Sequence, residues 1–539
     1  TKKELVLCLL FLICIVLPGA PVAALTPAAP VFWYVDGKPA ASPPAGAWPD
    51  VKKIEADSEL PGYQRFTDYP HGYSVCVPAG LRPDFSLSAL RSSFASPITQ
   101  IEIYYDNFSG YNPTAWDNMI DTNKNLLASP RHTITVQETF PWNGFIVNRI
   151  KWSRPPLATV SGDHNYYASL ELKLFAAEYY TILIKSSQPI DNDLDILHSF
   201  RWDAKRGAAG IFREQTPVRA NLSEETRQCV KKYFSPDSPL RWGLFDAYAP
   251  DELSHIKDLE SRLGYKFSFI LRYQSLDTEP PAEPLAKARA DGRFLELSME
   301  TTHTEANNAM HPGDRRINQE LMYDILDGKF DEHFREYART LKSYSHPVLF
   351  RFDNEMNGAW CWYSAIYAGK DTNIYKAVWR RVHSLFDEVG VNNVLWVWNP
   401  NDISLPNCKW NHPLMYYPGD DMVDIIGLTG YNAGNYFAGD TWREFPDIYR
   451  SLYADYSAWF DKPFIIGEFG ANSIGGDKVA WIDRMFQEMS QFPRIKVAIW
   501  WSWTDWDEAG RPGRIYLLDE TPATEAAFRR GLKNYLPQH

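Results

Sequence analysis

The chain has 539 residues and a mass of 61.9 kDa, a size that exceeds one ordinary domain and predicts at least two. Hydrophobic residues make up 45% and charged residues 23%, which excludes a disordered chain, and the net charge of −12 argues against a surface that binds nucleic acid. Aromatic residues reach 15%, which favours flat surfaces for ligands such as sugars, with an aromatic core as the alternative.

Residues 1–24 have the pattern of a secretory signal peptide. Lys2 and Lys3 precede an apolar run over residues 5–17, and small residues follow as far as Ala24, after which we expect cleavage. The apolar run is short for a membrane span. We therefore expect a protein that is secreted or held at the cell surface, with no membrane segment once the signal is removed.

The next part of the chain has the pattern of a small accessory domain. Residues 25–50, rich in Ala and Pro, predict a linker, and residues 51–205 predict an α+β domain with an antiparallel sheet. Apolar and polar residues alternate over residues 169–174, which is typical of a half-buried strand. We find no catalytic constellation here and expect a packing or spacer role, with ligand binding as the alternative.

A different pattern of apolar residues follows a predicted hinge over residues 206–237. Residues 238–539 contain short apolar runs separated by stretches long enough for a loop and an amphipathic helix, a pattern that predicts a (β/α)8 barrel. An open doubly wound sheet is the alternative, and the lack of a glycine-rich phosphate loop after the first strand disfavours it. The apolar runs begin near residues 241, 266, 293, 347, 393, 424, 463 and 496.

Two glutamates stand where predicted barrel strands end. Glu355 follows the fourth strand and Glu468 the seventh, so both fall on the face where such barrels place catalytic groups. Two carboxyl groups about 5–5.5 Å apart across the barrel mouth would form a retaining glycosidase pair. One would need a raised pKa to act as an acid while the other stays ionised as the nucleophile. The alternative is two structural acids in salt bridges.

Aromatic residues cluster at the ends of the fourth, fifth, sixth and eighth predicted strands. The face of an aromatic ring packs against the CH face of a sugar, so these residues predict a polysaccharide groove, with a core position as the alternative for each. His303, near the end of the third strand, is a further candidate for the groove, and a structural role is the alternative. The aromatic candidates are Trp360, Trp362, Trp398, Tyr431, Trp501 and Trp503.

These motifs carry a family resemblance. Residues 351–362, with the sequence RFDNEMNGAWCW, resemble the acid/base motif of glycoside hydrolase family 26, a family of β-mannanases and related endo-glycanases. Residues 466–470, IGEFG, resemble its nucleophile strand, and residues 325–331, ILDGKFD, are also similar to the family. The resemblance covers roughly residues 238–536 and leaves out the N-terminal domain.

The resemblance implies a role for each matching residue. Glu355 would be the acid/base and Glu468 the nucleophile, which Arg351 would keep ionised through charge pairing. The aromatic residues would bind sugar: Trp360 beside the cleaved bond, Tyr431 as a donor to the nucleophile, and Trp503 or Trp501 under the −1 sugar. The family usually has His directly before the acid/base, whereas this chain has Asn354, expected to contact the sugar 2-hydroxyl. That departure loosens the substrate assignment.

We therefore expect a secreted retaining endo-β-1,4-glycanase that cleaves β-mannan by double displacement. The alternatives are a mixed-linkage β-glucanase or xylanase, and a non-catalytic polysaccharide-binding surface protein. We expect no cofactor, no metal and no partner other than the polysaccharide, and a monomer. Cys361 and Cys408 lie on neighbouring loops of the catalytic rim, where a disulfide is topologically easy, with two free thiols as the alternative.

Overall fold

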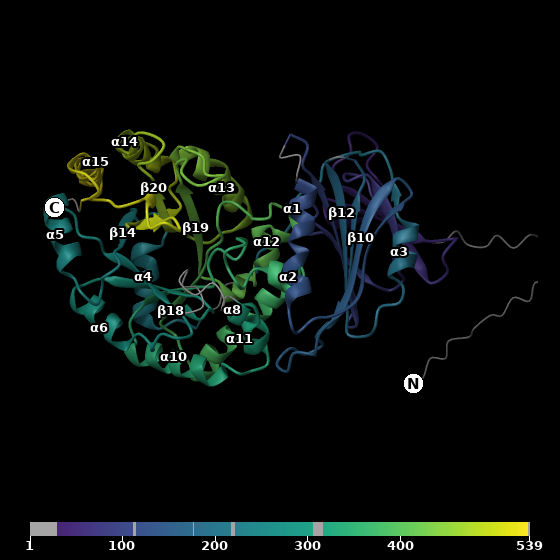
Figure 1. Cartoon of the computed structure of the whole chain (residues 1–539), viewed down its shortest axis with the longest axis horizontal. Helices are drawn as coiled ribbons and strands as arrows, with labels where there is room; N and C mark the ends of the chain where they lie inside the picture. The colour runs from purple at the N-terminus through teal and green to yellow at the C-terminus, as the bar shows by residue number, and fades with distance from the viewer. Residues whose placement is uncertain (1–29, 111–114, 176, 217–220, 305–315, 537–539) are drawn as a thin grey trace, which may run out of the picture.

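The computed structural model describes residues 30–110, 115–175, 177–216, 221–304 and 316–536. The predicted signal peptide lies outside these residues. Among them, no helix combines the length and the apolar character needed to cross a bilayer. Figure 1 shows two parts side by side, a β-rich part formed by residues 30–202 and a barrel formed by the described residues that follow.

The N-terminal part consists of two antiparallel sheets, so the predicted antiparallel domain is a sandwich. Apolar side chains of both sheets, such as Phe66 and Ile182, meet between them in one core. The first sheet has the order β13-β5-β4-β3-β1-β2 and the second β6-β7-β8-β12-β11-β10-β9. The strands are β1 Val31–Val35, β2 Lys38–Ala40, β3 Val51–Ala56, β4 Tyr63–Asp68, β5 Tyr73–Pro78, β6 Arg82–Asp84, β7 Ser92–Ala95, β8 Thr99–Asn107, β9 Thr133–Trp142, β10 Phe145–Ser153, β11 Tyr166–Lys173, β12 Glu178–Ser186 and β13 Arg201–Trp202.

Part of the predicted linker forms strands, and part of the predicted hinge forms a helix. Strands β1 and β2 occupy part of the predicted linker, because β1 pairs along its whole length with β3 and Tyr34 packs against the sandwich core. Helix α4, Glu224–Tyr233, occupies the predicted hinge. Its residue Cys229 is buried, and Phe234 just after it packs against Phe269 inside the barrel. The helix therefore covers the amino-terminal end of the barrel and is not a flexible connection.

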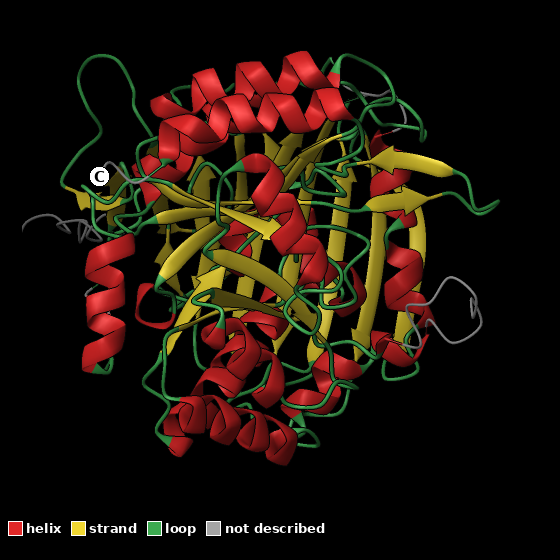
Figure 2. Cartoon of the chain, turned by 90° about the vertical axis from the view of Figure 1, so that its left-hand side faces the viewer, coloured by secondary structure: helices red, strands yellow, loops and turns green. Residues whose placement is uncertain are grey.

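The C-terminal part is a closed parallel barrel, and the eight predicted strands are confirmed (Figure 2). Each strand reads as a short apolar run because both of its faces are buried, one inside the barrel and one under the helices. The strands are β14 Arg241–Phe245, β15 Phe269–Gln274, β16 Phe294–Met299, β17 Val348–Phe352, β18 Val394–Trp398, β19 Ile425–Asn432, β20 Phe464–Ala471 and β21 Ile495–Trp501, and a hairpin of β22 Thr504–Trp506 and β23 Pro512–Ile515 follows.

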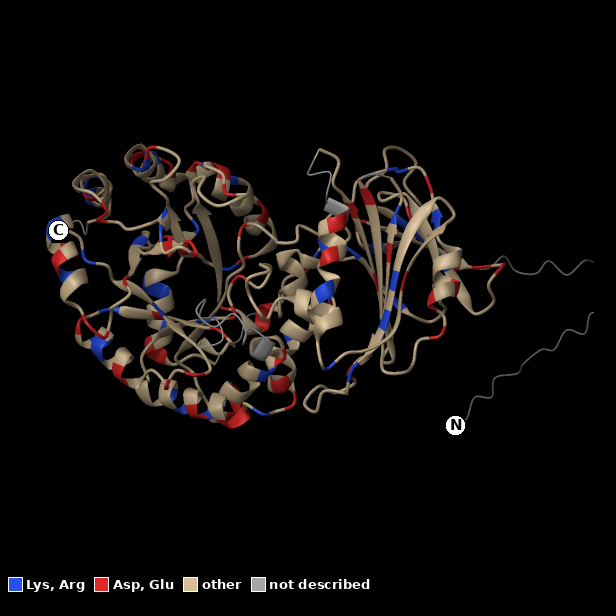
Figure 3. Ribbon diagram, viewed as in Figure 1, with Lys and Arg blue, Asp and Glu red and all other residues tan. Residues whose placement is uncertain are grey.

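Helices surround the barrel, and both signs of charge occur along their outer faces (Figure 3). The barrel helices are α5 Ser254–Leu263, α6 Ala282–Ala290, α8 Arg316–Gln319, α9 Leu321–Leu326, α10 Asp331–Tyr344, α11 Thr372–Val389, α12 Pro413–Tyr416, α13 Phe445–Trp459, α14 Lys478–Glu488 and α15 Pro522–Leu532. Short 3₁₀ helices are η1 Ala365–Ala368, η2 Lys409–Asn411, η3 Asp420–Met422, η4 Met489–Gln491 and η5 Lys533–Tyr535. The sandwich adds α1 Ala115–Asp121, α2 Asn123–Ala128 and α3 Asp193–Ser199.

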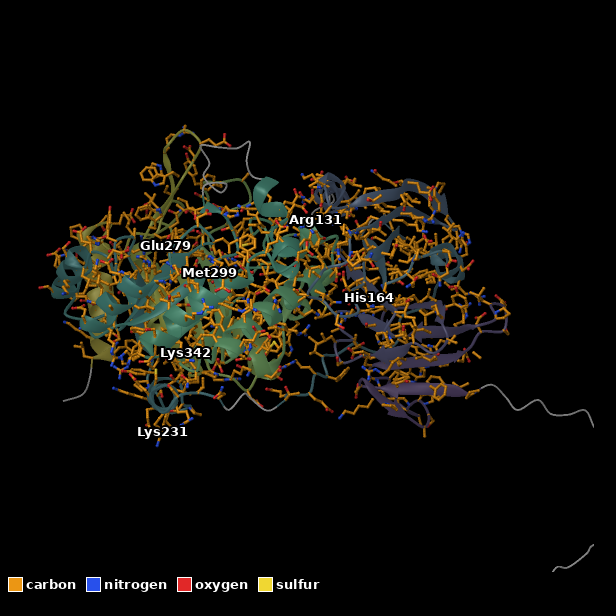
Figure 4. All side chains as sticks on the ribbon, turned by 90° about the horizontal axis from the view of Figure 1, so that it is seen from below. Arg131, His164, Lys231, Glu279, Met299 and Lys342 are labelled. Atoms are coloured by element: carbon orange, nitrogen blue, oxygen red, sulfur yellow. The ribbon has the colours of Figure 1, made fainter. Side chains whose placement is uncertain are left out.

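The sandwich meets the barrel through buried ion pairs. The ammonium group of Lys370, just before α11, lies 2.9 Å from Glu171 of β11. Lys185 of β12 lies 3.0 Å from Asp371 and 3.1 Å from Glu102 of β8. The polar side of β11, predicted to face water, is thus buried against the barrel, and the half-buried prediction is wrong for this strand. Figure 4 shows a further contact residue, Arg131, where the two parts meet.

Candidate active site

Glu355 stands on a strained backbone turn directly after β17. Asp353 and Glu355 have φ values of 42° and 56°, in the left-handed backbone region that residues other than Gly rarely adopt. Surrounding bonds hold the turn in place: the Glu355 amide donates to the Asn399 carbonyl at 2.7 Å, and the Tyr363 hydroxyl donates to the Asn354 carbonyl at 2.6 Å. The buried carboxylate of Asp353 accepts from Thr301 at 2.8 and 2.9 Å. Because these bonds hold the strained backbone in one conformation, they fix the direction of the Glu355 side chain.

The carboxyl group of Glu355 is held in a setting that favours its protonated form. Burial and the negative charge of Glu468 raise the pKa of Glu355 to about 8, against the opposing effect of a hydrogen bond from Asn401. The indole of Trp360 donates to the other carboxyl oxygen at 3.4 Å. A carboxylic acid that stays protonated near neutral pH can serve as a general acid.

Glu468, on β20, receives hydrogen bonds from three donors. The guanidinium of Arg351 and the hydroxyl of Tyr273 both donate to its Oε1, and the hydroxyl of Tyr431 donates to Oε2 at 2.8 Å. The side chain is buried, and its backbone pairs with Thr429 of β19. The contacts predicted for Arg351 and Tyr431 are present. Tyr273 was missed, although its place at the end of β15 could have indicated it.

Further polar groups lie behind the pair. Asn354 is buried, and its amide oxygen accepts from the hydroxyl of Ser298 at 2.9 Å. Glu296, inside the barrel, lies 3.5 Å from Arg351, and burial raises its pKa to about 7. Glu300, half-buried at the end of β16, also has a pKa raised to about 7 by burial and by the charge of Glu468. The sequence reasoning missed both acids, although Glu296 lies in the third strand and Glu300 directly follows it.

The predicted aromatic residues divide between exposed and buried positions. Trp360 and Trp503 are 51% and 40% exposed, as a sugar platform requires. Trp501 is half-buried and donates to the Tyr273 hydroxyl at 3.0 Å, while Trp362 is half-buried beside Tyr367. The groove position predicted for Trp398 is wrong. It is fully buried among Tyr417, Tyr456 and Phe460, because alternate side chains of β18 point outward under the helices.

His303 lies on the rim of the barrel. Its Nδ1 is 2.5 Å from the carboxylate of Asp277, which follows β15, and its amide donates to Asn318 at 2.7 Å. These contacts join two rim loops, as the structural alternative for His303 predicts. Across the described residues, no group of three His, Cys, Asp or Glu side chains is arranged to hold a metal ion.

The predicted disulfide is absent, because Cys361 and Cys408 are both free, buried thiols. The thiol of Cys361 turns under its loop toward the carbonyl of Asn354, 3.5 Å away. Burial raises the pKa of both thiols well above the ordinary value. Cys361 therefore supports the loop of Glu355 through packing and one weak hydrogen bond.

A closed parallel barrel with two carboxyl groups at the carboxyl ends of β17 and β20 is the architecture of the barrel glycoside hydrolases. The chain belongs to glycosyl hydrolase family 26. The family model matches residues 306–472. A mannan endo-1,4-beta-mannosidase of Bacillus subtilis is 31% identical over 302 residues, which are 53% of this chain and 72% of the relative.

Three further proteins are similar to parts of this chain. Endoglucanase H of Acetivibrio thermocellus is 30% identical over 216 residues, 39% of this chain and 23% of that protein. This chain spans only half of a second Bacillus subtilis mannan endo-1,4-beta-mannosidase. Among solved structures, a GH26 beta-mannanase from Bacteroides ovatus is 17% identical with a TM-score of 0.44, and the match covers 58% of this chain and 93% of that chain.

Proposed function

We propose that the protein is a retaining endo-β-1,4-glycanase that cleaves β-mannan. The proposal rests on the different surroundings of Glu355 and Glu468, which suit one to donate a proton and the other to act as the nucleophile. Burial raises the pKa of Glu355 to about 8, whereas Arg351, Tyr273 and Tyr431 direct donors at the carboxyl group of Glu468. One carboxyl group is thus suited to give a proton, and the other to attack as a carboxylate.

The reaction would proceed by double displacement. Glu468 attacks the anomeric carbon while Glu355 protonates the departing glycosidic oxygen, which leaves a covalent glycosyl-enzyme. Glu355, now ionised, removes a proton from water, which hydrolyses the intermediate and releases Glu468. The exposed rings of Trp360 and Trp503 supply apolar planes on which sugar rings can pack beside this pair.

The relatives support mannan as the substrate, since the Bacillus subtilis protein of which this chain covers 72% carries the name mannan endo-1,4-beta-mannosidase. Endoglucanase H, together with Asn354 in place of the usual His, keeps β-glucan as the second candidate. The pattern in residues 1–24 supports a further proposal, that the enzyme is secreted or held at the cell surface.

Release of reducing sugar from soluble β-mannan, mixed-linkage β-glucan and xylan tests the activity and the substrate together. We expect the fastest release from mannan, and NMR should detect the β-anomer of the product first. Preferential cleavage of β-glucan would replace the substrate assignment, and first formation of the α-anomer would refute retention. Binding without release would contradict the enzyme and favour a polysaccharide-binding protein.

The pH profile tests the assignment of the acid. Because Glu355 must be protonated to donate, and its pKa is about 8, kcat/KM should fall about tenfold per pH unit above pH 8. Glu355→Gln removes the titrating group, so this alkaline decline should disappear with an aryl glycoside whose leaving group needs no proton. A wild-type profile that stays flat to pH 10 would exclude Glu355 as the acid.

A further inference from the structure

A cavity lies where the sandwich, the connecting segment and the barrel meet. Its volume is about 160 Å³, room for about five water molecules at roughly 30 Å³ each. Three cationic side chains from three separate segments line it: Arg91 between β6 and β7, Arg213 in the connecting segment and Lys376 on α11. Leu87 and Met415 are among its other lining residues.

Two of the three cations already have partners. Arg91 pairs with Glu102 and lies 4.0 Å from Asp84. Arg213 pairs with Asp420 at 2.6 Å and also donates to the carbonyl of Trp459. These bonds fix the direction of both guanidinium groups and use only some of their N–H donors, so the others can donate to a ligand in the cavity.

Lys376 differs from both. Within the part of the chain that the structure describes, no carboxylate forms an ion pair with its ammonium group and no oxygen accepts a hydrogen bond from it. Burial and the charges of Arg91, Lys185 and Arg380 lower the pKa of Lys376 to about 7, against the opposing effect of Glu102. A half-buried cation in a positive surrounding is costly without a counter-ion.

We propose that this cavity binds a small tetrahedral oxyanion, such as sulfate or inorganic phosphate, between the sandwich and the barrel. The anion would accept hydrogen bonds from Lys376 and from the unpaired edges of Arg91 and Arg213, and charge-assisted bonds of this kind are the strong ones. A tetrahedral anion has several acceptor oxygens, which suits N–H donors that converge from three segments. Because the anion would bridge Arg91 of the sandwich and Lys376 of the barrel, it would stabilise the contact between the two parts.

Calorimetric titration with sodium sulfate at constant ionic strength tests the site. We expect saturable binding of one sulfate per chain, weakened at least tenfold by Lys376→Met. The matched control is Lys231→Met, which removes an exposed lysine of α4 that does not line the cavity and should bind as the wild type does. Binding by Lys376→Met within twofold of the wild type, or no saturable binding by the wild type, would overturn the proposal.

The pH dependence and a labelling experiment add independent readouts. Sulfate does not titrate near neutral pH, so its affinity should fall about tenfold per pH unit above pH 7 as Lys376 loses its proton. Trace acetylation of the wild type followed by peptide mass spectrometry should show that sulfate protects Lys376 and leaves Lys231 unprotected. Equal labelling with and without sulfate would contradict the site. Phosphate should compete with sulfate, and tighter binding of acetate would overturn the tetrahedral assignment.

Discussion

The groove and the junction between sandwich and barrel both bury carboxyl groups, but they treat the charges in opposite ways. At the junction, burial alone would raise the pKa of Glu102, yet Lys185 and Arg91 lower it to about 2. In the groove, burial raises the pKa of Glu296 to about 7 and that of Glu355 to about 8, despite Arg351 nearby.

The difference follows from the number of cations that face each acid. At the junction Glu102 meets two, whereas in the groove Glu296 and Glu468 share Arg351. Paired charges resist titration and hold parts together, while crowded carboxyl groups take up and release protons near neutral pH. Glu355, which has no cation of its own, is thus suited to proton transfer, and Glu102, paired with two cations, is suited to holding the junction together.

The largest effect should come from removing the attacking carboxylate. Glu468→Ala should lower kcat/KM at least about 10⁴-fold on mannan, because no other group forms the covalent intermediate. Azide should restore part of the rate by entering the space of the lost side chain. Asp277→Asn, on the same rim but paired with His303, is the control and should stay within about tenfold of the wild type. Near-normal activity of a folded Glu468→Ala protein would refute the nucleophile assignment.

Breaking an ion pair at the junction should lower the stability of the protein and leave its catalytic rate unchanged. Lys370→Met leaves Glu171 buried without its cation, 2.9 Å away in the wild type, and should lower the free energy of unfolding by about 3–5 kcal/mol in urea titrations. Adding Glu171→Gln should recover part of the loss, since it removes the stranded charge. Lys231→Met should change nothing. A loss below about 1 kcal/mol, or no recovery in the double variant, would contradict the role of this pair.

Removing a hydrogen bond to the nucleophile should have an intermediate effect on kcat. Tyr431→Phe removes the 2.8 Å bond to Glu468 and should lower kcat about 10- to 100-fold, the range of a bond to a charged group. The matched control is Tyr449→Phe, whose hydroxyl donates to the carbonyl of Gly430 on the same strand at 2.9 Å. It should affect stability and leave kcat within about threefold. Equal rates for the two variants would show that Tyr431 has no role at Glu468.

The smallest effect should separate a core tryptophan from a groove tryptophan. Trp398→Phe should leave kcat and KM within about twofold, because the ring is fully buried and its indole N–H has no hydrogen-bond partner to lose among the described residues. Trp360→Phe removes a donor to Glu355 and should shift the alkaline limb of the pH profile upward. A larger change in KM from Trp398→Phe than from Trp360→Phe would reverse this division.

The sequence by itself determined the barrel and the two glutamates. Strands buried on both faces appear as short apolar runs, and a carboxylate directly after such a run can only lie at a strand end. Both signals are local, so Glu355 and Glu468 could be found without knowing how the chain folds back on itself. The resemblance added the contacts of Arg351 and Tyr431, both of which the structure contains.

Only the tertiary structure decided what each polar or aromatic side chain faces. Trp398 alternates with groove residues in sequence, yet its side of β18 lies under helices. Glu171 looks solvent-facing in a strand of alternating pattern, and the barrel buries it. The partners that settle such cases come from distant segments, as Lys185 and Asp371 do across 186 residues. Burial is a property of two surfaces in contact, and the sequence describes only one of them at a time.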